Sequence, residues 1–109
     1  MKLPNGRHAL IPMSKIVGYC LNTNHHTGKH KARVFASALG ITASNAERLQ
    51  TLVRKAAIEG EVVSQLETNT GQQYKVDWEV PDSDQVILRT IWEIASSSSH
   101  PRLVSAFIK

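Results

Sequence analysis

The hydrophobic pattern of the chain changes its period near Gly60. Before this residue, apolar side chains recur at three- and four-residue intervals, which is typical of helices that bury one face. After it they recur at every second position, which is typical of strands. This order predicts an α+β fold, with two or three N-terminal helices packed on one face of a four-stranded antiparallel β-meander. A single domain is expected over 1–109, with helices at about 14–60 and the sheet at about 61–109.

Two helices are expected before residue 40. Ser14 is the predicted N-cap of the first, which runs over about 15–21. A polar loop at 22–28 leads to the second helix, over about 29–39, which ends at Gly40. Its predicted buried face consists of Val34, Phe35, Ala38 and Leu39.

A third helix has the clearest boundaries in the sequence. Ser44 and Glu47 have the spacing of a capping box, and Gly60 is placed to end the helix. Its apolar stripe consists of Leu49, Leu52, Val53 and Ala56.

Four strands should follow, joined by short turns. The third of them is apolar on both faces, which predicts an interior position in the sheet. The expected strands lie at 61–67, 73–80, 85–95 and 102–108, with turns or loops at 68–71, 81–84 and 96–101.

Composition restricts the class of protein only loosely. Of the 109 residues, 41% are hydrophobic and 20% charged, and the net charge of +4 is compatible with a nucleic-acid partner. The single cysteine, Cys20, excludes an internal disulfide and a multi-cysteine zinc site, and it should be a small core residue. No apolar run approaches the roughly 18 residues of a membrane span or forms the core of a signal peptide. A cytoplasmic protein is therefore expected, with no membrane partner.

Residues 22–35 hold an unusual concentration of bases without a carboxylate. Cations at the start of a helix are unfavourable, because the helix dipole is positive there. A bound anion would reverse that effect, and phosphate is the leading candidate. Lys31 is the most unusual member, since helical spacing places it on the apolar face, one turn before Phe35. The bases are His25, His26, Lys29, His30, Lys31 and Arg33.

A zinc site formed by His25, His26 and His30 is the alternative reading of this segment. It lacks the glutamate of the HExxH pattern, and the neighbouring cations would repel the ion. No metal and no cofactor are therefore predicted.

The chain contains the pattern His25-x-x-Gly28-x-His30-Lys31-Ala32-Arg33-Val34-Phe35, then Leu39-Gly40, Gly71-x-x-Tyr74, Trp92 and Pro101-Arg102-Leu103. With this pattern it resembles, over nearly its whole length, a small bacterial family catalogued as being of unknown function. Members occur in bacteria, cyanobacteria included, beside another small gene or as C-terminal modules of larger toxin-like proteins. The layout of helices and strands also resembles the barnase, EndoU, colicin and RelE-like ribonuclease superfamily.

The resemblance to the ribonuclease superfamily implies RNA cleavage without a metal. Such cleavage needs a base, an acid and cations that stabilise the charged phosphorane. Histidine suits proton transfer, and arginine or lysine suits the phosphorane. In two places the chain departs from the small bacterial family that it resembles. Phe107 stands where a tyrosine is common in that family, and His26-Thr27 replaces Pro-Arg. The catalytic candidates are His30, Lys31, Arg102 and Ser105, and the substrate-binding candidates are His25, Lys29, Arg33 and Arg89.

Arg89 has a second reading, as an ion-pair partner of Asp77 or Glu93. The expected activity is that of a metal-independent endoribonuclease toxin of a toxin–antitoxin or toxin–immunity pair. Its partners would be RNA and an acidic antitoxin or immunity protein, and a homodimer is left open. When fused to a larger toxin, the domain would be delivered into other cells. The alternative is a non-catalytic module that binds RNA or protein through the same basic patch.

Overall fold

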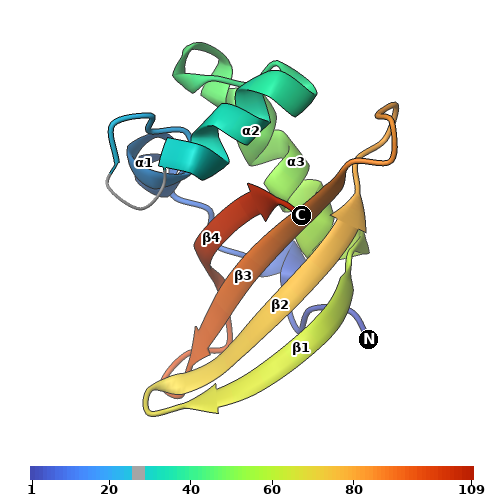
Figure 1. The fold of residues 1–109 in the computed structure, drawn as a ribbon. Helices are drawn as coiled ribbons and strands as arrows, with labels where there is room; N and C mark the ends of the chain where they lie inside the picture. Colours follow the sequence, from blue (N-terminus) through green and yellow to red (C-terminus); the bar gives the residue numbers. More distant parts are fainter. Residues whose placement is uncertain (26–28) are drawn as a thin grey trace.

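A twisted four-stranded sheet forms the frame of the protein in a computed structural model, which describes residues 1–25 and 29–109 (Figure 1). The strands lie in sequence order, and each pairs antiparallel with the next. Helices precede the strands along the chain, so the predicted α+β fold is confirmed. The strands are β1 (Glu61–Thr68), β2 (Gly71–Glu79), β3 (Ile87–Ala95) and β4 (Arg102–Ile108).

One face of the sheet is buried beneath α3 (Ala46–Glu59). The predicted alternation supplies this face, with Tyr74, Val76 and Trp78 of β2 all buried. The interior position expected for the third strand is confirmed, because β3 pairs with β2 and β4. It begins at Ile87 rather than at residue 85, since the preceding turn includes Gln85 in a left-handed conformation, with φ 58°.

The N-terminus of α3 is capped by residues other than those predicted. A short 3₁₀ turn, η3 (Ala43–Asn45), precedes the helix. The capping residues therefore lie closer to the N-terminus of the chain than predicted. The Thr42 hydroxyl accepts from the Ser44 N–H at 3.3 Å, and the Asn45 side-chain oxygen accepts from the Thr42 N–H at 2.7 Å. The predicted Ser44–Glu47 capping box is therefore wrong.

Helix α2 (Lys29–Leu39) has the predicted bounds but a narrower buried stripe. Ala32 and Phe35 are buried, whereas Val34 is 40% exposed and Ala38 is also exposed. The physical reason is position: α2 packs against β4 and η2 rather than across the whole sheet. A helix that contacts a single edge needs only one narrow row of apolar residues.

The first helix also differs from its prediction in detail. The α-helical turn α1 (Met13–Lys15) continues as the π-helix η2 (Ile16–Cys20). Pro12 occupies the N-cap position, and its carbonyl accepts from the Lys15 N–H at 3.0 Å. Ser14 therefore lies within the helix, and the predicted Ser14 cap is wrong.

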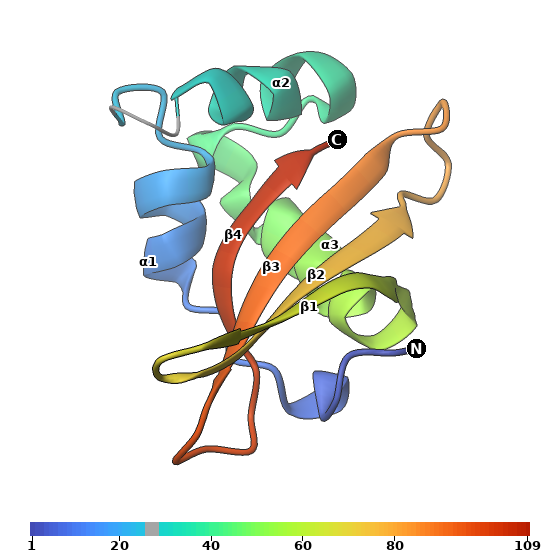
Figure 2. The ribbon, with the colours of Figure 1, turned by 60° about the horizontal axis from the view of Figure 1, so that its bottom comes forward.

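The N-terminal segment and the first helices gather around β4 (Figure 2). The Leu10 N–H donates to the Pro101 carbonyl at 2.8 Å, and the Leu103 N–H donates to the Leu10 carbonyl at 3.0 Å. These bonds hold the segment before α1 beside the start of β4. Helix α2 lies near the other end of the strand, so β4 connects the two regions where bases concentrate.

Candidate functional site

Five side chains from three parts of the chain form what we call the Lys31 cluster. Lys31, near the start of α2, places its Nζ 4.4 Å from the centre of the Phe107 ring and 5.9 Å from that of Tyr19. Both distances are within the range of cation–π attraction, which accounts for the half-buried position of this lysine. The cluster consists of Tyr19, His25, Lys31, Ser105 and Phe107.

His25 enters the cluster through its ring and is held by local backbone bonds. Its ring meets Tyr19 edge to face, with centroids 4.8 Å apart and planes at 88°. The His25 N–H donates to the Asn22 carbonyl at 3.2 Å, and its own carbonyl accepts from the Lys29 N–H at 3.1 Å. These bonds place the His25 imidazole near the start of α2.

Ser105 contributes a buried hydroxyl that is not paired. The residue is only 6% exposed, and its Oγ has no hydrogen-bond partner among the residues that the structure describes. Burying a hydroxyl without a partner typically costs about 1–3 kcal/mol. Ser105 and Phe107 pair with Ile91 and Arg89, so both lie on the same face of β4, about 7 Å apart along the strand. An unsatisfied donor on the face of β4 where Lys31 contacts Phe107 is suited to a ligand oxygen.

Arg89 adopts the second of its two expected roles, that of an ion-pair partner of Asp77. Its Nε and Nη2 donate to the two carboxylate oxygens of Asp77 at 2.7 and 2.8 Å, and the Lys109 Nζ lies 3.4 Å from the same carboxylate. These hydrogen bonds from Arg89 hold the pKa of the Asp77 carboxyl below its usual value, although burial acts in the opposite direction. The guanidinium is therefore engaged by Asp77, next to Phe107 in the sheet.

Arg102 does not join the Lys31 cluster. It opens β4, whereas Phe107 lies near the end of the same strand, and five strand residues span about 15 Å. Its side chain is exposed beside Leu10 at the opposite end of the strand. The sequence placed Arg102 and Lys31 in one catalytic group, and the fold separates them.

The other predicted bases lie around the first turns of α2. His30 and Arg33 are exposed, and Lys29 is half-buried. His26 lies outside the described residues. Within the described ranges, no three His, Cys, Asp or Glu side chains gather closely enough to hold a metal ion.

Tyr19 and Lys15 are site residues that the sequence reasoning missed. The Lys15 Nζ lies 5.6 Å from the centre of the Tyr19 ring, so Tyr19 is flanked by Lys15 and Lys31. A lysine four residues before a tyrosine on a helix is a recognisable signal for such a contact. Cys20, next in the chain, is buried as predicted, and burial raises the pKa of its thiol.

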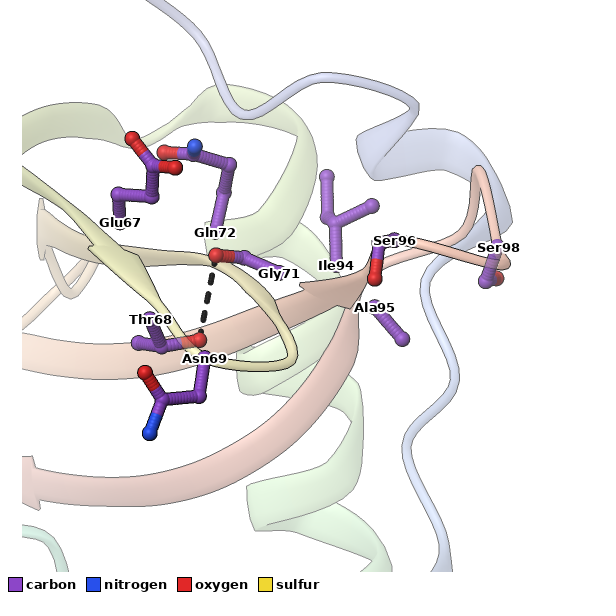
Figure 3. A pocket seen from close by; sticks show the side chains of 9 residues that line it. All are labelled: Glu67, Thr68, Asn69, Gly71, Gln72, Ile94, Ala95, Ser96 and Ser98. Atoms are coloured by element: carbon purple, nitrogen blue, oxygen red, sulfur yellow. Dashed lines mark hydrogen bonds between the residues drawn. The ribbon is translucent and has the colours of Figure 1, made fainter.

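A hollow of about 400 Å³ lies away from these bases, at the β1–β2 hairpin (Figure 3). The Thr68 hydroxyl donates to the Gly71 carbonyl at 3.1 Å and closes the hairpin there. Glu67 is the charged residue in its lining, which includes no lysine or arginine. This hollow is therefore unsuited to a phosphate.

Comparison with known proteins identifies a family but no activity. A family model described as "Domain of unknown function (DUF6883)" matches residues 2–109. No curated protein and no solved structure matches the chain. Among the described helices, none has the length and apolar character needed to cross a membrane.

Proposed function

The chain belongs to this family of unknown function, and from the Lys31 cluster we propose that it is a metal-independent endoribonuclease. The observation that carries the proposal is the buried Ser105 hydroxyl, which has no partner among the described residues, on the face of β4 where Lys31 contacts Phe107. A cation and an unsatisfied donor on the same face of β4 suit a phosphate group. The imidazole and phenol beside them supply groups for proton transfer.

The proposed reaction is attack of the RNA 2′-oxygen on the neighbouring phosphorus. A bond forms between phosphorus and the 2′-oxygen, and the bond to the 5′-oxygen breaks, which leaves a 2′,3′-cyclic phosphate. His25 takes the proton of the 2′-hydroxyl, and the Tyr19 hydroxyl donates a proton to the leaving 5′-oxygen. Lys31 and the Ser105 hydroxyl stabilise the additional negative charge on the phosphorane.

Tyr19 gives the proposal a feature that the sequence did not suggest. Phe107 lacks the hydroxyl of the tyrosine that is common at this position in the family that the sequence resembles. Lys31 lies close to the rings of both Phe107 and Tyr19, so the phenol of Tyr19 is available in the same cluster. We assign it the role of the acid because a phenol hydroxyl can donate a proton to the leaving oxygen.

The test is cleavage of a fluorogenic single-stranded RNA in the presence of EDTA. Lys31→Met keeps most of the apolar stem and removes the charge, and the rate should fall by about 100-fold, the effect of removing one transition-state donor. Lys55→Met removes an exposed charge on α3 and should cleave like the wild type. Tyr19→Phe removes the proposed proton donor and should also lower the cleavage rate.

Two results would contradict the proposal. One is a wild-type protein that leaves RNA intact, or that cleaves it only when a divalent metal is added. The other is a Lys31→Met variant that cleaves as fast as Lys55→Met. A substrate with 2′-deoxyribose at every position should stay intact, since it lacks the attacking oxygen.

The biological role that we propose is that of a toxin in a toxin–antitoxin or toxin–immunity pair. The net charge of +4 favours an acidic partner protein that covers the bases near Lys31. Induced expression without the partner should stop bacterial growth. Lys31→Met should relieve this arrest, and Lys55→Met should not.

A second candidate is a non-catalytic RNA-binding module. It is favoured by the separation of Arg102 from Lys31, which removes one predicted catalytic cation from the cluster. In that case the protein binds RNA in a salt-dependent manner, releases no cyclic phosphate and does not arrest growth.

A further inference from the structure

Arg102 borders several hollows in the protein surface beside β4. It lines three adjoining hollows, of about 270, 230 and 360 Å³. Lys15 shares the first of them, His100 the second, and Leu10 the second and third. An arginine that borders several hollows can contact an extended ligand from more than one side.

These hollows connect Arg102 to the Lys31 cluster through Lys15. Lys15 lines a hollow with Arg102, and its Nζ also lies 5.6 Å from the Tyr19 ring. Lys31 approaches the same ring from α2 at 5.9 Å. The three cations therefore follow one another along β4, from its end near Lys31 to its start at Arg102.

Beyond Arg102, two stacked histidines continue this row of basic side chains. His100 shares a hollow with Arg102, and its ring stacks on that of His8, with centroids 5.6 Å apart and planes at 26°. The Asn5 side chain donates to the Ser99 carbonyl at 2.7 Å and holds the two loops together. We call this surface the β4 basic strip; it consists of Lys31, Tyr19, Lys15, Arg102, His100 and His8.

We propose that the β4 basic strip binds single-stranded RNA in an extended conformation, with Lys15 and Arg102 as phosphate-positioning residues. This inference rests on the proposed function for its choice of RNA, and it extends the substrate away from the Lys31 cluster along β4. It assigns Arg102 a role in holding the substrate rather than in the chemical step.

Alternation of cations and rings is the reason for choosing a single strand. Cations contact phosphates in any nucleic acid, whereas rings stack only on bases that are not enclosed in a duplex. Tyr19 lies between Lys31 and Lys15, and the His100–His8 pair follows Arg102. Leu10, 51% exposed beside Arg102, adds an apolar surface that a duplex backbone would not use.

One carboxylate, that of Glu93, borders the strip and opposes anion binding there. Glu93 pairs with Arg102 across the sheet and lines two of the same hollows. Its Oε2 accepts from the Thr70 hydroxyl at 3.3 Å, toward the β1–β2 hairpin. The three fixed cations Lys15, Lys31 and Arg102 outnumber this one acid, so the strip retains a positive balance.

The experiment measures binding without cleavage. A labelled single strand of 2′-O-methyl RNA cannot react, because its 2′-oxygens carry no proton, and fluorescence anisotropy reports its affinity at several salt concentrations. Lys15→Ala and Arg102→Ala should each weaken binding about fivefold and reduce the salt slope by about 0.7. The double variant should combine both losses, since the two residues contact different phosphates.

The matched control removes two exposed cations of α3, in the variant Arg54→Ala/Lys55→Ala. It loses the same net charge and should change the affinity less than twofold. Equal melting temperatures measured by circular dichroism show that each variant is folded. The inference is overturned if the control weakens binding as much as Lys15→Ala/Arg102→Ala, or if neither pair has an effect.

Two competing ligands complete the test. A duplex of equal length and polyglutamate should both bind more weakly than the single strand, and equal binding of either overturns the inference. Because the readout is binding, it is separate from the cleavage assay. If the protein cleaves RNA but the strip substitutions do not weaken binding, only this inference is disproved. If the strip substitutions weaken binding but the protein does not cleave RNA, only the proposed endoribonuclease activity is disproved.

Discussion

The Ser105→Ala variant should be more stable and less active than the wild type, because it lacks the buried hydroxyl of Ser105. Removal of the hydroxyl eliminates a buried donor that has no partner among the described residues, at a residue 6% exposed. Burial of such a group costs about 1–3 kcal/mol, and part of this gain is offset by the small space that the oxygen leaves. We expect a net gain of about 1 kcal/mol, or a rise of about 4 °C in the melting temperature.

The Thr90→Val variant is the control for the direction of this change in stability. The Thr90 hydroxyl is also buried but is paired: it accepts from the Trp92 Nε1 at 2.7 Å. Valine has nearly the same shape and leaves the buried indole N–H without an acceptor, so this variant should lose about 2 kcal/mol. The two substitutions each remove one buried hydroxyl and should move stability in opposite directions.

Urea denaturation, followed by tryptophan fluorescence, measures both free energies of unfolding. The slope against urea should stay constant, so that the midpoint reports stability alone. RNA cleavage by Ser105→Ala should fall by about tenfold or more, because a donor to the phosphorane is lost. A Ser105→Ala variant that loses as much stability as Thr90→Val would refute the reasoning, since the hydroxyl would then have a stabilising partner.

Three further predictions concern stability and reactivity. Because Arg89 lowers the pKa of Asp77, the ion pair contributes stability that is present above the carboxyl's unfolded pKa, about 3.9, and is lost as the pH falls through the lower folded value. Asp77→Asn should therefore flatten the acid side of the stability profile from urea titrations, and an unchanged profile would contradict the assignment. Thr42→Ala should cost about 1 kcal/mol in chemical denaturation, as the loss of an N-cap does, and a neutral result would place the cap elsewhere. The buried Cys20 thiol, with its raised pKa, should react with a thiol reagent only after unfolding, and rapid labelling of the native protein would show that the site opens.

The period of the hydrophobic pattern determined the fold class and the approximate positions of the helices and strands. Helix α2 and strand β4 begin and end where the sequence predicted, because Gly40 and Pro101 interrupt the pattern beside them. Caps were less predictable. Thr42, Ser44 and Asn45 are all suitable capping residues, and the choice depended on a 3₁₀ turn that adds no hydrophobic signal.

The sequence by itself identified Lys31 as unusual, since a lysine on an apolar helix face needs a specific neighbour. Only the tertiary structure decided that this neighbour is a pair of rings, from Tyr19 and Phe107, and that Arg102 is elsewhere. Periodicity reports which face of its own element a residue occupies. Where along β4 a helix docks depends on long-range packing and on the irregular pairing near Trp92, neither of which leaves a local pattern.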